Sequence, residues 1–377
     1  MSNPSNTPKK MEHFHIYGDR HEYCGWPAVT KAKNGDILVS FCRTDEHMGP
    51  SGAIWMVRST DNAKTWSSPI VVRDTLLDDR EEGITTLRDG RLIMHDWSTC
   101  HNINTYETLD EFSYEPAVIE KWKREVAGVE YLRSANLHGG WTLLSEDNGS
   151  TWDLMGRGPD SVHGGIHLAS GDVLVASYRE SAPNIDIWSA SEKDLKWEKR
   201  SVFKSTGVVA KDSDAPGIRF GEPHVTQLPS GRVILGLRAT SVPYDDKGDK
   251  NFFYFATSDD DGRTWSEAHK TEIWGFPPQL LTLSDGRVLC SYSHRREPYG
   301  ERVCISEDGV TWKKENEVVL RDDADGVDLG YPHSIELEPG RILTVYYQSP
   351  HSEPAFEMSP PDPMRPKPSI MGTIWEV

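Results

Sequence analysis

The sequence is poor in cysteine and in cationic residues, and it lacks any long apolar run. Its five cysteines are scattered, which argues against a disulfide framework and leaves no paired zinc-binding spacing. Lys and Arg number 41 against 59 Asp and Glu, and the formal net charge of −18 argues against binding to nucleic acid or to an anionic membrane. No apolar run has the roughly 18 residues that a membrane span needs.

Signals for targeting and for cofactors are also missing. The first ten residues lack the apolar stretch of a secretory signal, so we expect a cytoplasmic protein. No phosphate-binding loop or dinucleotide fingerprint is present, and His13 and His15 have no evident third ligand, so we expect neither a cofactor nor a metal. Hydrophobic residues make up 36% of the 377 residues, which is enough for a large core.

Six glycine turns, each followed by a short apolar strand, give the chain an internal repeat. Asn34-Gly35 leads into Asp-Ile-Leu-Val-Ser-Phe, and Asp285-Gly286 leads into Arg-Val-Leu-Cys-Ser-Tyr. Such turns between strand-forming segments are strong hairpin signals, so each copy predicts two antiparallel strands. The turn glycines are Gly35, Gly90, Gly171, Gly231, Gly286 and Gly340, spaced 54 to 60 residues apart except for one interval of 81.

A second repeat, of the form Ser-x-Asp-x-Gly-x-Thr-Trp with small variations, alternates with the first. It predicts a tight turn in which the aspartate accepts backbone N–H groups, the glycine adopts a positive φ and the tryptophan packs beneath. We expect these residues to be structural. The copies are Ser59–Trp66, Ser145–Trp152, Ser258–Trp265 and Ser306–Trp312, with a decayed copy at Ser191–Trp197.

Two hairpins in each period of about 55 residues predict one all-β domain over residues 1–377, a six-bladed β-propeller with four-stranded antiparallel blades. The long interval predicts an insertion at about residues 100–138 in the second blade, where Pro116–Leu132 has helical periodicity. We expect this helix to pack on the blade, with a lid or a homo-oligomer contact as the alternatives. Residues 371–377 are expected to supply the last strand that closes the ring.

Alignment of the six copies on the turn glycine predicts which residues gather at one mouth of a central funnel, since a hairpin brings the start of strand one and the end of strand two to the same end. Arginine follows the second strand in four copies, although the chain is acidic. Its fork of donors suits carboxylate, sulfate or phosphate, so we predict an anion site; the alternative is that each arginine pairs with a neighbouring carboxylate. The four are Arg43, Arg179, Arg238 and Arg295, and Arg80 and Arg296 add to them.

Glu222 and Tyr331 both stand nine residues before the turn glycine, in blades four and six. A phenol whose ordinary pKa is near 10 needs a base or a nearby positive charge to act as a nucleophile, which Glu222 and the arginines would provide. His224 and His333 follow two residues later, on the same strand face, and are candidate ligand-binding residues.

These motifs resemble the sialidase superfamily, whose Asp boxes have the same Ser-x-Asp-x-Gly-x-Thr-Trp form. The resemblance covers nearly the whole chain and implies a propeller that cleaves an acidic sugar. By this resemblance Glu222 matches the general base and Tyr331, in Asp-Leu-Gly-Tyr-Pro, matches the nucleophile. Arg238 and Arg295 (or Arg296) match the second and third arginines of the carboxylate-binding triad.

The sequence departs from the family pattern at two places. Gly25 stands where the first triad arginine is expected, and residues 49–51, where the acid/base aspartate would fall, hold no carboxylate. Asp45 and His47 are nearby substitutes, and Asp79 is a third titratable group at this mouth. The departures favour another anionic sugar, such as a uronate or a deoxy-keto acid, over an ordinary sialoside.

We therefore predict an exo-acting glycosidase for an anionic carbohydrate, with Tyr331 as nucleophile, Glu222 as base and Asp45, His47 or Asp79 as proton donor. A uronate lyase that uses the histidines and Tyr331 is one alternative, and a non-catalytic sugar-binding propeller is another.

Overall fold

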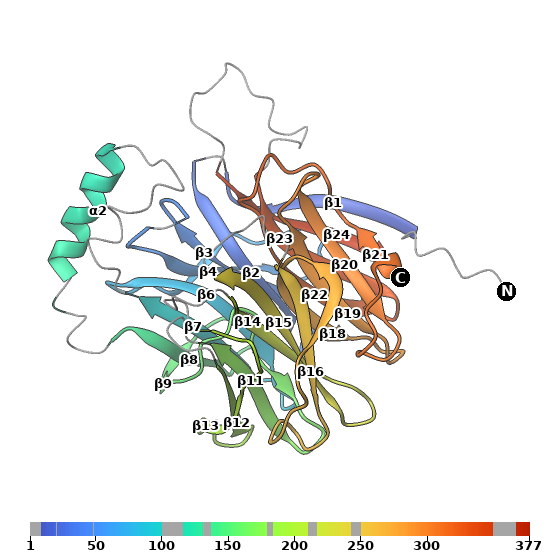
Figure 1. Ribbon diagram of the computed structural model, residues 1–377. Coiled ribbons are helices and arrows are strands. Elements are labelled where there is room, and N and C mark those ends of the chain that lie inside the picture. The colour runs from blue at the N-terminus through green and yellow to red at the C-terminus, as the bar shows by residue number, and fades with distance from the viewer. Residues whose placement is uncertain are drawn as a thin grey trace.

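The computed structural model describes residues 9–19, 21–47, 49–99, 116–129, 131, 137–178, 184–209, 217–242, 250–349 and 367–377. Their strands form six four-stranded antiparallel sheets around a common axis (Figure 1). The first strands of neighbouring sheets lie side by side, so they line the axis. The predicted six-bladed β-propeller is therefore confirmed.

Blades one to three follow one another along the chain, each running outwards from the axis. The first is β2 (Tyr23–Lys31), β3 (Ile37–Thr44), β4 (Ala53–Ser59) and β5 (Ile70–Arg73). The second is β6 (Asp78–Thr86), β7 (Leu92–Thr99), β8 (Gly139–Ser145) and β9 (Asp153–Arg157). The third is β10 (Ile166–His167), β11 (Asp172–Tyr178), β12 (Ile185–Ser191) and β13 (Glu198–Phe203).

Blades four to six repeat this order, and the last takes its outer strand from the N-terminus. The fourth is β14 (Gly217–Gln227), β15 (Val233–Val242), β16 (Phe252–Ser258) and β17 (His269–Trp274). The fifth is β18 (Phe276–Thr282), β19 (Val288–His294), β20 (Gly300–Ser306) and β21 (Glu317–Val319), preceded by the 3₁₀ turn η2 (Lys314–Asn316). The sixth is β22 (Gly330–Glu338), β23 (Arg341–Gln348), β24 (Ser369–Glu376) and β1 (Lys9–Tyr17).

The two ends of the chain close the ring together. Strand β1 pairs antiparallel with β24, with Phe14 opposite Gly372, and Figure 1 shows them side by side. The C-terminal closing strand was predicted, whereas the pairing of residues 9–17 with it was not. Ile16 from this strand is buried in the core that the sixth and first blades share, together with Val39 and Val345. Closure therefore buries apolar side chains as well as pairing a strand edge.

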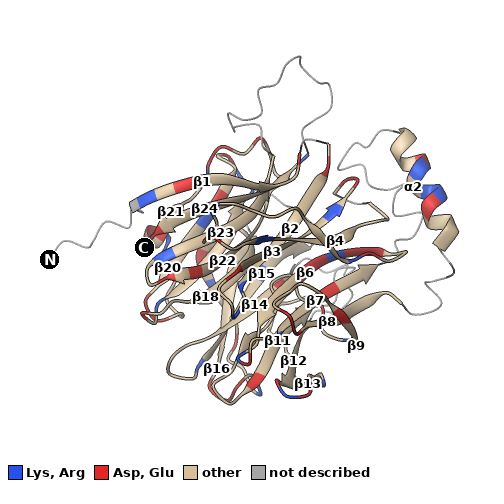
Figure 2. Ribbon diagram, turned by 180° about the vertical axis from the view of Figure 1, so that it is seen from behind, with Lys and Arg blue, Asp and Glu red and all other residues tan. Residues whose placement is uncertain are grey.

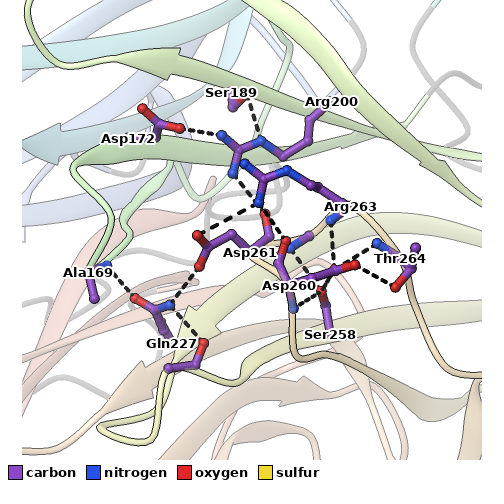
Figure 3. Close-up of polar contacts among 12 residues, drawn as sticks. Ala169, Asp172, Ser189, Arg200, Gln227, Ser258, Asp260, Asp261, Arg263 and Thr264 are labelled. Atoms are coloured by element: carbon purple, nitrogen blue, oxygen red, sulfur yellow. Dashed lines mark hydrogen bonds and ion pairs between the residues drawn. The ribbon is translucent and has the colours of Figure 1, made fainter.

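The Asp-box repeats form the tight turns expected of them. In the fourth blade, Oδ1 of Asp260 accepts hydrogen bonds from the hydroxyl of Ser258 at 2.8 Å and from the backbone N–H of Thr264 at 2.8 Å (Figure 3). The Thr264 hydroxyl donates to Oδ2 at 2.7 Å. Trp265, at the end of this turn, packs against the core shared by blades three and four. The aspartate thus fixes the turn, and the tryptophan joins it to the preceding blade.

Helix α2 (Pro116–Val129) lies between β7 and β8, within the segment where the insertion was expected; residues 100–115, 130 and 132–136 lie outside the described residues. Trp122 and Val126 are buried, and Lys121 forms an ion pair with Asp45. Figure 2 shows acidic and basic residues intermixed along this helix. In the described part of the chain, no helix is both long enough and apolar enough to cross a membrane.

Candidate active site

The innermost strands share a bulge at the position that the alignment on the turn glycines identified. The pairing register shifts there in five of the six blades. Four residues at these bulges have positive φ values although they are not glycine: Trp26 (52°), Glu81 (54°), Glu222 (42°) and Tyr331 (50°). Non-glycine residues seldom adopt this conformation, and it is concentrated at functional sites. A bulge also redirects a side chain from its strand, so this ring is a candidate site built by the repeat itself.

The blades approach one another closely beside this ring. A Cβ atom on Gly83 of the second blade would lie 1.9 Å from the backbone nitrogen of Gly164 in the third. Only glycine allows this contact, so the second and third blades approach each other closely beside the bulge in β6.

Tyr331 and Glu222 meet at the centre of the site. The Tyr331 hydroxyl lies close enough to the Glu222 carboxylate for the two groups to shift each other's pKa, and Arg238 forms an ion pair with the same carboxylate. Burial alone would raise the pKa of Glu222, but the charge of Arg238 and the hydrogen bond that Arg238 donates hold it below its usual value. Burial raises the pKa of Tyr331 well above its usual value, and the charges of Glu222 and Glu81 add to this. The resting pair is therefore a neutral phenol beside an ionised carboxylate that can accept its proton.

A second cluster joins the first and sixth blades. The Tyr23 hydroxyl donates to Oδ1 of Asp328 at 2.8 Å, and Nδ1 of His47 lies 3.0 Å from the same oxygen and 2.7 Å from the Tyr23 hydroxyl. Burial would raise the pKa of Asp328, but the charge of His47 and the hydrogen bonds from His47 and Tyr23 lower it. An ionised Asp328 can accept a hydrogen bond from the Nδ1–H group of His47, and this bond fixes the orientation of the His47 ring.

An aromatic side chain connects these two clusters. The ring centre of Trp26 lies 5.2 Å from that of His47 and 6.4 Å from that of Tyr331. Tyr23 fills the space beside Gly25, since a Cβ atom on Gly25 would lie 3.0 Å from the Tyr23 ring. The position at which the family resemblance expected an arginine is therefore bordered by aromatic side chains.

Two of the three predicted proton donors have other partners. Asp45 pairs with Lys121 of helix α2, and its side chain is 43% exposed. Asp79 is buried, where it accepts hydrogen bonds from Ser98 and from the backbone N–H of Thr75 at 2.7 Å and lies 3.3 Å from Arg73. Because these contacts join β5, β6 and β7, Asp79 has a structural role between the first two blades. His47 remains as the candidate held beside the central aromatic cluster.

The arginine side chains at the mouth have partners within the protein. Arg80 lies 2.9 Å from Asp78 in a buried ion pair, donates to the carbonyl of His47 at 2.8 Å and stacks 4.5 Å from the Trp26 ring centre. Arg295 donates to the carbonyl of Leu329 at 3.1 Å.

Arg43 and Arg296 also contact side chains within the protein. Arg43 forms an ion pair with Glu22 and lies 4.7 Å from the ring centre of Trp55. Arg296 lies 4.1 Å from the ring centre of Trp274. Arg179 is outside the described residues. Pairing with neighbours, the alternative to an anion site, therefore describes Arg43, Arg80 and Arg238, each of which has a carboxylate partner.

The predicted histidines lie in a buried cluster with a third histidine that the sequence did not single out. The ring centre of His163 lies 5.3 Å from that of His224, 5.7 Å from that of His333 and 6.4 Å from that of Tyr331. Burial lowers the pKa of both His224 and His333 to about 3, so both rings are neutral. Nδ1 of His224 accepts a hydrogen bond from the backbone of Leu280 at 2.9 Å. Across the described ranges, no group of three or more His, Cys, Asp or Glu side chains is placed to hold a metal ion.

Glu81, Tyr23 and Asp328 were not among the predicted site residues. Glu81 also stands nine residues before a turn glycine, Gly90, but it belongs to the charged run from Asp78 to Glu82, which also fits a solvated turn. The structure instead gives Glu81 the same left-handed bulge conformation as Glu222 and Tyr331. Alignment on the turn glycine was thus the signal that could have identified Glu81. Tyr23 and Asp328 had no such signal, because they come into contact only where the first and sixth blades meet.

Comparisons with known proteins agree with the repeat pattern. Residues 173–320 match the BNR repeat-like domain family, and the complete ring matches solved sialidase structures. The chain is a six-bladed propeller with the sialidase fold, and it contains a BNR repeat-like domain, so we refer to it as a BNR-repeat propeller. This confirms the resemblance inferred from the Asp boxes. No curated protein matches the sequence of this BNR-repeat propeller.

Three solved structures place the BNR-repeat propeller among known folds. A protein of unknown function from Dyadobacter fermentans is 23% identical, with a TM-score of 0.70 over 97% of this chain and 98% of that one. The NanB sialidase of Streptococcus pneumoniae is 16% identical, with a TM-score of 0.64 over 97% and 70%. A GH93 α-L-arabinofuranosidase of Fusarium graminearum, solved with arabinobiose, is 14% identical, with a TM-score of 0.57 over 97% and 97%. At these identities the similarity establishes the fold alone.

Proposed function

We propose that this BNR-repeat propeller is a glycoside hydrolase that removes a terminal sugar, with Tyr331 as nucleophile and Glu222 as its base. The observation that carries the proposal is that the buried Tyr331 phenol lies close enough to the buried Glu222 carboxylate for each group to shift the pKa of the other. Tyr331 is 5% exposed and Glu222 8% exposed, so the end of a sugar chain suits this site better than its middle. The sialidases and the arabinofuranosidase with the same fold act on glycosides, which supports the reaction class.

The chemistry follows from the two clusters. As the Tyr331 oxygen attacks the anomeric carbon, its proton passes to Glu222, and the bond to the leaving oxygen breaks. We assign the proton donor to His47, oriented by Asp328, because Asp45 and Asp79 have other partners. In the second step His47 takes a proton from water, whose oxygen attacks the anomeric carbon, and Tyr331 leaves with the proton held by Glu222.

Turnover of aryl glycosides tests the proposal directly. We expect at least one glycoside to be hydrolysed with retention of anomeric configuration, measured by NMR of the first product formed. The Tyr331→Phe variant is expected to lose at least about 1,000-fold in kcat/KM, since it lacks the attacking oxygen. Tyr254→Phe, on β16 in the fourth blade, is the matched control and should retain activity. An inverted product, an unsaturated product that absorbs in the ultraviolet, or full activity of Tyr331→Phe would each contradict the mechanism.

A further inference from the structure

One short segment carries residues of both clusters of the proposed site. Asp328, which holds His47, and Tyr331, the proposed nucleophile, are three residues apart where the sixth blade begins. Gly330 and Tyr331 both have positive φ values, of 134° and 50°. Because a non-glycine residue adopts this conformation at a cost, the surrounding structure has to hold Tyr331 in it. We call residues 328–331 the nucleophile segment.

Arg295 of the fifth blade holds the nucleophile segment by its backbone. Nε and Nη2 of Arg295 both donate to the Leu329 carbonyl oxygen, at 3.3 and 3.1 Å. Leu329 is fully buried, and its own backbone N–H donates to the Val327 carbonyl at 3.0 Å. One edge of a guanidinium group presents two N–H donors in a fixed geometry, which a lysine ammonium does not. A charged side chain from the neighbouring blade thus fixes the carbonyl that lies between the two clusters.

The fifth blade also fits closely against Gly330 in the nucleophile segment. A Cβ atom on Gly330 would lie 2.5 Å from the Ser293 hydroxyl oxygen and 3.6 Å from Nη2 of Arg295. The Arg295 guanidinium lies 5.5 Å from the ring centre of Phe276, whose side chain is fully buried. The guanidinium group therefore contacts a fixed aromatic ring as well as the segment.

The charge of Arg295 also acts on the carboxylates of both clusters. Burial would raise the pKa of Glu222 and that of Asp328. Arg238 and His47 are the main charges that lower these two pKa values, and Arg295 adds to both effects. An ionised Glu222 can accept the phenol proton, and an ionised Asp328 orients His47. The same guanidinium therefore supports the protonation states that both clusters need.

We propose that Arg295 is a positioning residue: by fixing the nucleophile segment, it keeps Tyr331 and Asp328 aligned with their partners in the two clusters. The family resemblance assigned Arg295 to a substrate carboxylate instead. The proposal rests on the proposed hydrolase function and extends it, because Arg295 is then needed whether or not the substrate carries a charge.

The Arg295→Met variant removes the charge and the donors and keeps an unbranched side chain. On a neutral 2,4-dinitrophenyl glycoside, whose leaving oxygen needs no proton, we expect kcat to fall at least about 10-fold with little change in KM, because Tyr331 is no longer aligned. On the phenyl glycoside of the same sugar, which also needs the proton donor, the loss should be at least about five-fold larger. Arg287→Met, at the other end of β19, where Arg287 pairs with Asp285 at 2.7 Å, should leave both rates unchanged.

A substrate-binding role for Arg295 gives a different result. If Arg295 bound a substrate carboxylate, Arg295→Met would raise KM for a uronide or a sialoside and leave the neutral glycosides at the wild-type rate. That pattern would overturn the proposal. Equal losses on the phenyl and the 2,4-dinitrophenyl glycoside would contradict the part of it that concerns Asp328.

Hydrogen exchange tests the anchoring without any turnover. The Leu329 amide, which donates to the Val327 carbonyl, should exchange at least about 10-fold faster in Arg295→Met than in wild type, measured by mass spectrometry of the peptide that contains residues 328–331. Arg287→Met should match wild type. Arg295→Lys keeps the charge but not the pair of donors, so it should also exchange faster, and it replaces Arg295→Met if that variant does not fold. Wild-type exchange at Leu329 in the folded variant would overturn the proposal.

The two proposals can fail separately. Faster exchange at Leu329 in Arg295→Met, together with full activity of Tyr331→Phe, would support the anchoring and contradict the hydrolase mechanism. Loss of activity in Tyr331→Phe, together with wild-type exchange and wild-type kinetics in Arg295→Met, would support the mechanism and contradict the positioning role.

Discussion

Tyr331 of the sixth blade and Glu222 of the fourth lie close enough to shift each other's pKa, and both side chains leave their strands at the same left-handed bulge. The repeat therefore does more than build the scaffold. It provides an equivalent redirected position in several blades, and the chain places a phenol and a carboxylate at two positions that meet at the axis. Trp26 and Glu81 occupy two further positions of this ring.

Replacing Glu222 with glutamine should separate catalysis from folding. The amide keeps a hydrogen-bond acceptor for Arg238 and Tyr331 but cannot take the phenol proton, so kcat should fall about 100- to 10,000-fold with little change in KM. Glu336→Gln is the control, because Glu336 accepts backbone hydrogen bonds in an outer turn, at 2.7 Å from Ser284 and 2.9 Å from Gly340. Steady-state kinetics that show equal losses in both variants would argue against a base at Glu222.

The proton donor can be identified by varying the leaving group. His47→Asn should lose about 100-fold or more in kcat/KM on a phenyl glycoside, whose leaving oxygen needs a proton. On a 2,4-dinitrophenyl glycoside, whose leaving oxygen does not, the loss should be within about 10-fold. Asp328→Asn should follow the same pattern more weakly, since Asp328 acts by orienting His47. Equal losses on both substrates would indicate that His47 has another role.

The buried histidine cluster should make the fold sensitive to acid. The pKa of His333 is about 3 in the folded protein, against 6.5 ordinarily, because the ring is buried. Between these values the unfolded chain binds a proton that the folded chain does not, so the free energy of unfolding falls as the pH falls from about 6.5 to 3. One such histidine contributes a slope of up to about 1.4 kcal/mol per pH unit.

Urea unfolding at pH 7, 6, 5 and 4 measures this slope. The His333→Gln profile should be flatter than that of wild type, even if the variant is less stable at every pH. His269→Gln, which alters an exposed position on β17, should keep the wild-type slope. Parallel profiles for wild type and His333→Gln would contradict the buried, neutral assignment.

The Asp-box turn offers a test of the scaffold that is independent of catalysis. Asp260→Ala removes the acceptor of the Ser258 and Thr264 hydrogen bonds and should lower the free energy of unfolding by about 1–2 kcal/mol. The adjacent Asp259 is exposed and pairs with Arg232 at the surface, so Asp259→Ala should lower the free energy of unfolding less than Asp260→Ala does. Thermal unfolding of the two variants should differ in this order, and the reverse order would contradict the structural role of the repeat.

The fold could be predicted from the sequence because the glycine turns recur in all six blades and the Asp boxes, one of them decayed, recur in five. The outermost strand of the sixth blade was missed, since residues 9–17 carry no turn motif and pair with β24, which lies at the other end of the sequence. The fourth strand of the sixth blade therefore depends on tertiary pairing, for which the sequence contains no local signal.

The site was predictable in part. Alignment on the turn glycine brought Glu222 and Tyr331 to one end, where the two groups lie close enough to shift each other's pKa. It could not give the partners of the arginines, because Arg238 reaches back to Glu222 across its own hairpin and Arg80 turns to Asp78 in its own strand. Side-chain direction at a bulge does not follow simple strand alternation, so Asp79 and Glu81 could not be ranked from the sequence.

The measurement that tests the central claim most directly is identification of the covalent intermediate. The protein would be incubated with an activated fluorinated analogue of its best glycoside, which slows the second step, then denatured, digested and mapped by mass spectrometry. We predict one added sugar on the peptide that contains Tyr331, attached to its phenol oxygen, and no label in Tyr331→Phe. A sugar attached to Glu222 or to another residue, or turnover of the analogue without any adduct, would contradict a tyrosine nucleophile at this site.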